Sequence, residues 1–310
     1  TVKKLAAADV DEVLAEWAGL GYYSRARNLH ACAQQVVNQF SGKFPSDPLL
    51  LEQLKGIGRS TAGAIAAFAF HERAPILDAN VKRILARLFA VEGALQDKAV
   101  NDRLWQLATD LLPTEPKNMP VYTQALMDFG ATWCTSRNPV CMSGEKKCPY
   151  LKDCQANLSG QVLLFPQKVV KAKSPEFNCD MVLIRNGNTV LLQKRPSKAI
   201  WGGLWSLPEG PWEPRVSAKS PDVKAKDLLV AALPNEKTAT LLKGSQKMIQ
   251  GEQIKHVFTH RRLWMQIWQA NPSKELTFLN PDLKWVSLNQ LGRYGLPLPI
   301  KILLQGLSLV

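Results

Sequence analysis

The chain has 310 residues, of which 46% are hydrophobic and 21% are charged, a composition that excludes disordered and collagen-like proteins. A chain of this length is expected to form two domains rather than one core. Its 39 Lys and Arg residues against 26 Asp and Glu give a net charge of +13, which favours a polyanionic partner, nucleic acid above all.

Residues 9–155 are predicted to be almost wholly helical, because apolar residues recur there at helical spacing. The longest apolar stretch, 61–70, is far shorter than the roughly 20 residues that a bilayer requires, so no membrane segment is predicted. The first distinctive segment is Gly19-Leu20-Gly21-Tyr22-Tyr23-Ser24-Arg25-Ala26-Arg27-Asn28-Leu29. Aromatic and apolar side chains between basic residues suit insertion into a stack of bases. A tyrosine pair that packs against the start of a helix explains the same residues without any function.

The second distinctive segment is Leu54-Lys55-Gly56-Ile57-Gly58-Arg59-Ser60-Thr61. Its two glycines permit a tight hairpin whose backbone N–H groups point away from a helix N-terminus, which makes an anion site. The segment resembles a helix-hairpin-helix, a motif that grips a DNA phosphate without reading the sequence. An ordinary turn between two helices is the alternative.

Asp78 stands twenty residues past Gly58, in Ile76-Leu77-Asp78-Ala79-Asn80-Val81-Lys82-Arg83. A new helix is predicted to begin directly after it. Aspartate commonly accepts hydrogen bonds from the first free N–H groups of a helix, so Asp78 is expected to be an N-cap. Taken by itself, this aspartate has no further role.

Six cysteines occur at positions 32, 134, 141, 148, 154 and 179, and four of them fall within 21 residues. Such clustering favours a metal centre in a reducing compartment over a disulfide framework. A [4Fe-4S] cluster needs four thiolates of this kind, and a structural zinc site is the alternative. The candidate ligands are Cys134, Cys141, Cys148 and Cys154. Cys32 and Cys179 stand apart and are expected in the core.

The sequence changes character after residue 155. A polar linker is predicted over 156–177, followed by a β-hairpin with strands at 181–184 and 190–192 around Asn186-Gly187-Asn188. Strand-like runs follow at 256–258 and 263–268, and a closing helix is expected over 300–307. This second half is α+β and carries 21 basic against 10 acidic residues, whereas residues 1–155 carry 18 against 16. The second half is therefore expected to touch a phosphate backbone.

The order of these segments resembles the helix-hairpin-helix superfamily of DNA glycosylases. The resemblance implies that residues 1–155 form an all-helical glycosylase domain with an iron-sulfur cluster loop. In that superfamily, the aspartate that matches Asp78 stabilises the oxocarbenium-like charge that forms as the glycosidic bond of a flipped nucleotide breaks. The superfamily pattern Cys-x6-Cys-x2-Cys-x5-Cys favours a [4Fe-4S] cluster over zinc. This chain departs from it, because Met142–Lys147 places six residues where the family has two.

The Gly-Leu-Gly-Tyr-Tyr segment narrows the resemblance to adenine DNA glycosylases of the MutY type, with Tyr22 at the position of their intercalating tyrosine. The related thymine-glycol glycosylases carry a strand-nicking lysine where this chain has Ser60, so lyase activity is not expected. Lys82 is interpreted as a phosphate contact. The residues that the resemblance assigns to DNA binding are Leu20, Gly21, Tyr22, Gly56, Gly58, Arg59, Ser60 and Lys82.

That family has a second domain, similar to the Nudix hydrolase MutT, which recognises 8-oxoguanine opposite the target adenine. Residues 190–196 and 201–208 resemble it and predict a Nudix-like α/β sandwich over 178–310. Phe258, Thr259 and His260 resemble the family's Phe-Ser-His loop, although a strand with alternate residues on one face explains them equally. A Nudix hydrolase holds Mg²⁺ with a Glu-rich helix. The acidic residues between 209 and 229 lack that array, so binding without hydrolysis is expected: Glu209, Glu213, Asp222 and Asp227.

The resemblance implies a base-excision repair enzyme that removes adenine mispaired with 8-oxoguanine or guanine in double-stranded DNA. It is expected to be a cytoplasmic monomer, associated with the nucleoid in a bacterium. The family's general acid is a glutamate on a helix that would precede Thr1. General acid catalysis contributes about 10²–10⁴-fold, so this chain alone is expected to be nearly inactive. The alternative is a non-catalytic or truncated protein that binds DNA lesions.

Overall fold

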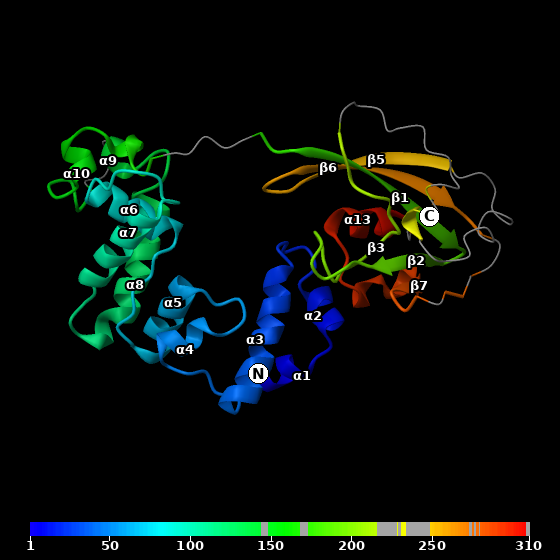
Figure 1. Ribbon diagram of the computed structural model, residues 1–310, viewed down its shortest axis with the longest axis horizontal. Coiled ribbons are helices and arrows are strands. Elements are labelled where there is room, and N and C mark those ends of the chain that lie inside the picture. The colour runs from blue at the N-terminus through cyan, green and yellow to red at the C-terminus, as the bar shows by residue number, and fades with distance from the viewer. Residues whose placement is uncertain are drawn as a thin grey trace. The chain divides into compact units, whose positions relative to one another are not determined.

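The computed structural model describes residues 1–143, 148–167, 173–215, 228, 231–233, 249–272, 275, 277–278 and 280–307 (Figure 1). The chain divides into two compact units. Unit 1 comprises Thr1, Lys3–His30 and Ala172–Val310, and unit 2 comprises Val2 and Ala31–Lys171. No helix among the described residues is long and apolar enough to cross a membrane.

Unit 2 is helical, in agreement with the sequence analysis (Figure 1). Its helices are the second part of α3 (Ser24–Phe40), α4 (Pro48–Glu52), α5 (Arg59–Phe70), α6 (Ala79–Leu88), α7 (Lys98–Asp110), α8 (Met119–Asp128), α9 (Val140–Ser143) and α10 (Gln155–Leu158). Shorter turns are η1 (Pro116–Asn118), the π-helical η2 (Phe129–Trp133) and η3 (Val162–Leu164). Residues 71–78 between α5 and α6 form no helix or strand. Because α10 and η3 lie within 156–177, the first part of the predicted linker is folded.

Gly63 lets α5 lie directly against the segment that leads to Asp78. A Cβ atom at Gly63 would overlap the carbonyl oxygen of Pro75 and lie 3.1 Å from its carbonyl carbon. Backbone atoms cannot yield as the end of a flexible side chain can, so Gly63→Ala is expected to destabilise unit 2 by roughly 1–3 kcal/mol. Denaturant unfolding followed by circular dichroism measures the change. Gly306→Ala is the control, because nothing lies within 4 Å of a Cβ there; equal stability of both variants would contradict this packing.

Unit 1 contains short helices and a mixed sheet (Figure 1). The helical elements are α1 (Val2–Ala7), α2 (Val10–Glu16), the start of α3, η4 (Leu288–Arg293) and α13 (Leu298–Leu307). The strands are β1 (Glu176–Asn186), β2 (Thr189–Lys194), β3 (Trp205–Ser206), β4 (Glu213–Pro214), β5 (Ile249–Val257), β6 (Arg262–Ala270) and β7 (Leu283–Ser287). The predicted hairpin, the two strand-like runs and the closing helix are therefore confirmed.

The strand order is β3-β2-β1-β6-β5, with β4 paired to β1 and β7 paired to β2. β1 and β6 are parallel, whereas the other pairs are antiparallel. The predicted turn joins β1 to β2, with Asn186 opposite Thr189. Helices in one unit and a mixed sheet in the other confirm the predicted α+β class.

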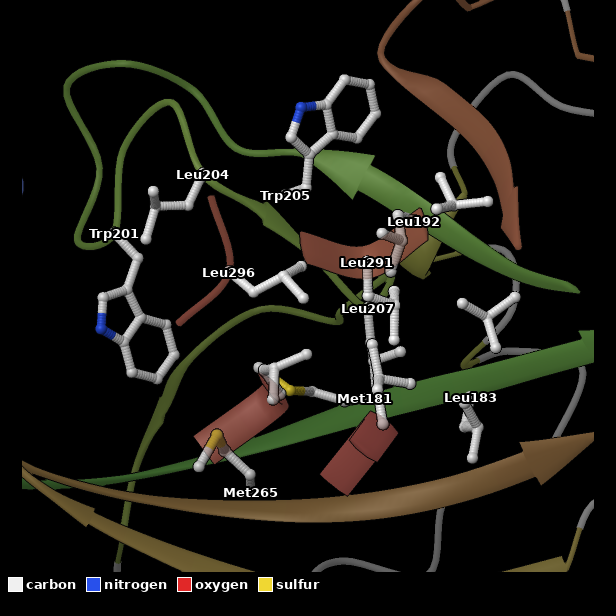
Figure 2. Packing of buried hydrophobic residues seen from close by; sticks show 14 of the residues in the cluster. Met181, Leu183, Leu192, Trp201, Leu204, Trp205, Leu207, Met265, Leu291 and Leu296 are labelled. Carbon is white, nitrogen blue, oxygen red and sulfur yellow. The ribbon is translucent and has the colours of Figure 1, made fainter. Parts of the chain in front are cut away.

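One face of this sheet carries the main core of unit 1. Figure 2 shows Met181 and Leu183 of β1 near Met265 of β6, beneath Leu291 and Leu296. Alternate residues of a strand share a face, which is why 181, 183 and 265 meet in one layer.

The same core accounts for the position of residues 3–30. Leu14, Tyr23 and Ala26 are buried in the cluster that also contains the sheet residues Met181 and Met265. Residues 3–30, which fall in the predicted domain 1–155, pack in unit 1 because their apolar face is buried there. Both lone cysteines, Cys32 and Cys179, are buried as expected.

Candidate functional site

Gly56 and Gly58 shape the connection between α4 and α5 in unit 2. Gly56 has a φ of +81°, which a residue with a Cβ rarely adopts. Gly58 is the N-cap of α5 and provides no side-chain acceptor, so the first amide groups of this 12-residue helix are not satisfied by a cap. Helix N-termini of this kind attract phosphate.

Asp78 is the N-cap of α6, as its position in the sequence predicts. Its Oδ1 accepts a 2.8 Å hydrogen bond from the Val81 backbone N–H. Oδ2 receives no hydrogen bond from a described residue, and the side chain is partly exposed. One carboxylate oxygen is thus fixed by the helix, while the other has no hydrogen-bond donor among the described residues.

Ser60 connects the hairpin to this aspartate. Its Oγ accepts a 2.9 Å hydrogen bond from the backbone N–H of Leu77, the residue before Asp78. The start of α5 and the start of α6 are therefore joined, which brings the predicted phosphate site and the predicted catalytic carboxylate into one part of unit 2. A hydroxyl here can position backbone but cannot form a Schiff base.

Two predicted DNA contacts have partners within unit 2. The Lys82 ammonium donates a 2.7 Å hydrogen bond to Oδ1 of Asn101 in α7. The exposed Arg59 guanidinium lies 3.9 Å from the centre of the Trp105 ring. Both cations thus contact residues of α7. A phosphate contact by either side chain stays a prediction, and it requires that these interactions be shared or released.

The four clustered cysteines come from separate short elements but line one cavity. Cys134 follows η2, Cys141 lies in α9, and Cys154 is the N-cap of α10. Burial raises the pKa of the Cys141 thiol, and neighbouring Cys148 raises it further. Any metal bound here must therefore displace thiol protons.

Among the described residues, no three His, Cys, Asp or Glu side chains are arranged to hold a metal ion, so the four thiols line the cavity without forming a preassembled site. Both centres considered for them, a [4Fe-4S] cluster and a zinc ion, use four thiolates.

Arg87 of α6 gives the cavity a buried positive charge. Its side chain is 2% exposed and donates to Sγ of Cys134 at 3.4 Å. Its other acceptors are the backbone carbonyl oxygens of Thr135, Ser136, Val162 and Phe165. No carboxylate of a described residue forms an ion pair with it. A buried cation without a carboxylate partner fits a cluster of net negative charge.

Arg83 ties the same helix to the cysteine segment at a second point. Its guanidinium donates to the carbonyl oxygens of Cys134 at 2.7 Å and Gly130 at 2.6 Å. It also donates to Oδ1 of Asn80 at 2.9 Å. α6 therefore carries Asp78 at its start and two arginines that anchor the Cys134 segment.

In unit 1, the two adjacent tyrosines of the Gly-Leu-Gly-Tyr-Tyr segment have different environments. Tyr23 is buried, and its hydroxyl donates to the carbonyl oxygen of Leu296 at 3.3 Å. Tyr22 is 65% exposed and Leu20 is 63% exposed. Tyr23 therefore packs against its neighbours, as the alternative without a function predicted. Tyr22 is exposed, so its insertion into a stack of bases stays a prediction.

Tyr22 has a φ of +48°, an unfavourable conformation for a residue with a side chain. Its hydroxyl shares a 2.7 Å hydrogen bond with Oγ1 of Thr259, and Arg25 lies 5.3 Å from its ring centre. These contacts hold the tyrosine in place. They also bring together two segments that the sequence assigns to the same lesion.

The two segments form a cavity of about 490 Å³. Its lining residues are Gly21, Tyr22, Tyr23, Ser24, Arg27, Ala199, Ile200, Trp201, Gly202, His256, Val257, Phe258, Thr259 and His260. The Phe258 ring lies 5.1 Å from Trp201, so one wall is aromatic. None of the lining residues is acidic, whereas Arg27 is a cation, so the cavity suits a ligand rich in hydrogen-bond acceptors. We name it the recognition pocket.

Glu209 is engaged in a buried cluster. Its Oε1 forms an ion pair with Arg195 and accepts a 3.2 Å hydrogen bond from Nε1 of Trp212. These partners compete with any Mg²⁺ ion for the carboxylate. Glu213 is exposed in β4, and Asp222 and Asp227 lie outside the described residues.

Several residues at these two sites were not identified from the sequence. Arg83 and Arg87 follow Asp78 on a helix, but a sequence does not show that such arginines turn inward to backbone carbonyls. Arg27 belongs to the quoted Tyr22 segment and donates to the carbonyl oxygen of Gly202. Trp201 and His256 belong to quoted segments as well, but long-range packing alone brings them to the pocket.

Comparisons with known proteins match two families to successive parts of the chain. Residues 1–109 match the family described as "HhH-GPD superfamily base excision DNA repair protein", and residues 180–306 match the family described as "NUDIX domain". The chain is 31% identical over 306 residues to the adenine DNA glycosylase of Buchnera aphidicola subsp. Schizaphis graminum (strain Sg), an alignment that covers 98% of this chain and 82% of that protein.

Two further relatives carry the same name. The chain is 36% identical over 208 residues to that of Buchnera aphidicola subsp. Acyrthosiphon pisum (strain APS), covering 67% of this chain and 58% of the relative. It is 41% identical over 211 residues to that of Arabidopsis thaliana, covering 64% of this chain and 32% of the relative. The matches thus span 58% and 32% of the lengths of these two relatives.

Proposed function

The chain belongs to the adenine DNA glycosylase family, and on that premise we propose that it removes adenine mispaired with 8-oxoguanine or guanine in double-stranded DNA. The observation that carries this proposal is the position of Asp78. The backbone N–H of its neighbour Leu77 donates a hydrogen bond to Ser60 at the start of α5, while Oδ2 of Asp78 accepts no hydrogen bond from a described residue. A phosphate-binding hairpin and a free carboxylate oxygen in one place suit chemistry on a nucleotide.

In this mechanism the hairpin holds a DNA phosphate through the amides at the start of α5. An extruded nucleotide then presents its sugar to Asp78. As the bond from C1′ to adenine breaks, positive charge develops on the sugar, and Oδ2 of Asp78 stabilises it. The Val81 hydrogen bond fixes Oδ1, so the carboxylate needs little reorganisation. Water completes the hydrolysis: its oxygen bonds to C1′, and one hydrogen in net terms goes to the departing adenine. Ser60 provides no amine for a covalent lyase intermediate.

The recognition pocket is proposed to bind the 8-oxoguanine opposite the adenine. The exposed Tyr22 enters the base stack, and Thr259 contacts the oxidised base through its hydroxyl. The acidic residues that would repel an acceptor-rich base are absent from the pocket lining. Binding of the lesion by unit 1 adds selectivity to a reaction whose carboxylate lies in unit 2.

A [4Fe-4S] cluster is proposed at Cys134, Cys141, Cys148 and Cys154. The buried Arg87 charge and the cavity that the four cysteines share support this assignment. When bound, the cluster supplies a rigid anionic cross-link between these cysteines. Arg83 and Arg87 attach the cross-linked segment to α6, the helix that Asp78 caps.

Single-turnover incubation with a duplex that pairs adenine with 8-oxoguanine tests the proposed reaction. Abasic sites are counted by alkali cleavage, for the 310-residue chain and for a version extended upstream by the glutamate-bearing helix of its family. Release of adenine by either form supports the proposal. Tight lesion binding with no release by either form would favour the alternative of a protein that binds lesions without catalysis.

Removing the Thr259 hydroxyl is expected to reduce the preference for 8-oxoguanine. Thr259→Val keeps the side-chain shape but loses the group that meets Tyr22 and the base, so the ratio of Kd values for G·A and 8-oxoguanine·A duplexes should fall by about tenfold. Thr259→Ser retains the hydroxyl and is the control. An unchanged ratio in Thr259→Val would show that the hydroxyl is not part of lesion recognition.

A further inference from the structure

His256 is a second polar group in the recognition pocket, outside the Phe258-Thr259-His260 loop. It lies near the end of β5, two positions before Phe258, which directly follows the strand. The ring centre of His256 is 4.5 Å from that of Phe258, in an edge-to-face arrangement, and 5.2 Å from that of Trp201. Two aromatic neighbours therefore hold the imidazole at the pocket wall.

The nitrogens of His256 are open to the pocket. The ring makes no hydrogen bond to a described residue, and neither nitrogen is among the buried side-chain atoms without a partner. The ring edge is therefore accessible, although the residue as a whole is half-buried. An accessible donor–acceptor edge in the cavity that Thr259 and Tyr22 also line can form hydrogen bonds with a base.

The surroundings of His256 keep its imidazole neutral. Burial lowers its pKa below the ordinary histidine value. The titratable and charged groups that share the pocket are Arg27 from α3, Tyr22 and Tyr23 from the segment before it, and His260 from the hairpin. No lining carboxylate stabilises an imidazolium. Near neutral pH, one ring nitrogen therefore carries hydrogen and the other is an acceptor.

We propose that His256 determines specificity by accepting a hydrogen bond from N7–H of 8-oxoguanine. Oxidation at C8 places a hydrogen on N7, whereas N7 of guanine is itself an acceptor. An unprotonated imidazole nitrogen is attracted by the N7–H of 8-oxoguanine and repelled by the N7 lone pair of guanine. This inference rests on the proposed function, because it requires that the pocket receives the oxidised base.

Protonation of His256 should change the preference for 8-oxoguanine, whereas a histidine that only packs against its neighbours would have no such effect. An imidazolium has two N–H donors and no acceptor, so it loses the contact with N7–H and gains one with N7 of guanine. Because the pKa of His256 is lowered by burial, the preference for 8-oxoguanine should be full above the ordinary histidine pKa. It should decline as the pH falls through the lowered value.

The experiment measures Kd of the full 310-residue chain for 8-oxoguanine·A and G·A duplexes between about pH 5 and 8. His256→Phe keeps the ring packing and should lower the Kd ratio about tenfold at neutral pH. It should also abolish the decline at acid pH. His256→Gln, whose amide oxygen accepts but does not titrate, should retain part of the preference without the pH step. His260→Phe tests whether the other histidine of the pocket causes the pH dependence. In this variant the decline of the preference at acid pH should persist.

The outcomes separate this inference from the proposed function. A wild-type chain that binds both duplexes equally would contradict lesion recognition by the pocket itself. A wild-type preference that survives unchanged in His256→Phe, with its pH step, would overturn the role of His256 alone. If His256→Phe lowers the unfolding midpoint, His256→Gln provides the test instead. A Kd ratio that still declines at acid pH in His256→Gln would contradict the proposal.

Discussion

Asp78→Asn is expected to reduce the rate of adenine release by about 10³-fold or more while leaving DNA binding and folding almost unchanged. The substitution removes the negative charge that stabilises the developing oxocarbenium ion. Asparagine is as good an N-cap as aspartate, so the hydrogen bond from the Val81 N–H to the side chain is retained. Asp78→Ala would additionally lose the cap, at about 1 kcal/mol of stability.

The measurement is the single-turnover rate in whichever form of the chain releases adenine, together with Kd for the same duplex. Asp47→Asn is a matched control, because Asp47 caps α4 through a 2.8 Å hydrogen bond from the Leu49 N–H in the same unit. It should leave the rate unaltered. Activity of Asp78→Asn within tenfold of wild type would remove Asp78 from the mechanism.

Arg87→Met is expected to destabilise unit 2 by roughly 3–5 kcal/mol, the range for breaking a buried charged network. Methionine has similar length but no donors, so four backbone carbonyl groups and the Cys134 sulfur lose their partner. Buried acceptors without a donor are costly. The segment that follows η2 should then no longer hold Cys134 toward the other thiols.

Two measurements check this expectation: the free energy of unfolding, and the iron and sulfide bound per chain after reconstitution. Both should fall in Arg87→Met. Arg103→Met on the exposed side of α7 controls for the loss of one positive charge and should shift stability by less than about 0.5 kcal/mol. Full iron binding and normal stability in Arg87→Met would contradict a role for Arg87 at the cavity.

Local patterns predicted the elements and the candidate residues that lie close together in sequence. The hairpin before α5, the N-cap Asp78 and the β1–β2 turn each depend on a few adjacent residues, and all three are present. Burial of the lone cysteines followed equally from their apolar neighbours.

Features that depend on distant packing were not predictable in this way. The packing of residues 3–30 in unit 1 does not follow from helical periodicity, because an amphipathic helix does not specify which surface will cover it. An arginine such as Arg87 is expected at the surface from its sequence, yet it is buried and donates to backbone carbonyl oxygens at four different positions. The sequence shows His256 only as a strand residue. Its place in a cavity with Trp201 and the Tyr22 segment depends on the folded structure.

Unit 1 is discontinuous in sequence, and this determines when it can fold during synthesis. Tyr22 and Thr259 are separated by 237 positions, an interval that a ribosome takes roughly 10–50 s to translate. During that time α2 has no sheet on which to bury Leu14, so its apolar face is open to solvent or chaperones. The helices of unit 2 have all been synthesised by then. The hydrogen bond between Tyr22 and Thr259 therefore forms late in the synthesis of each chain.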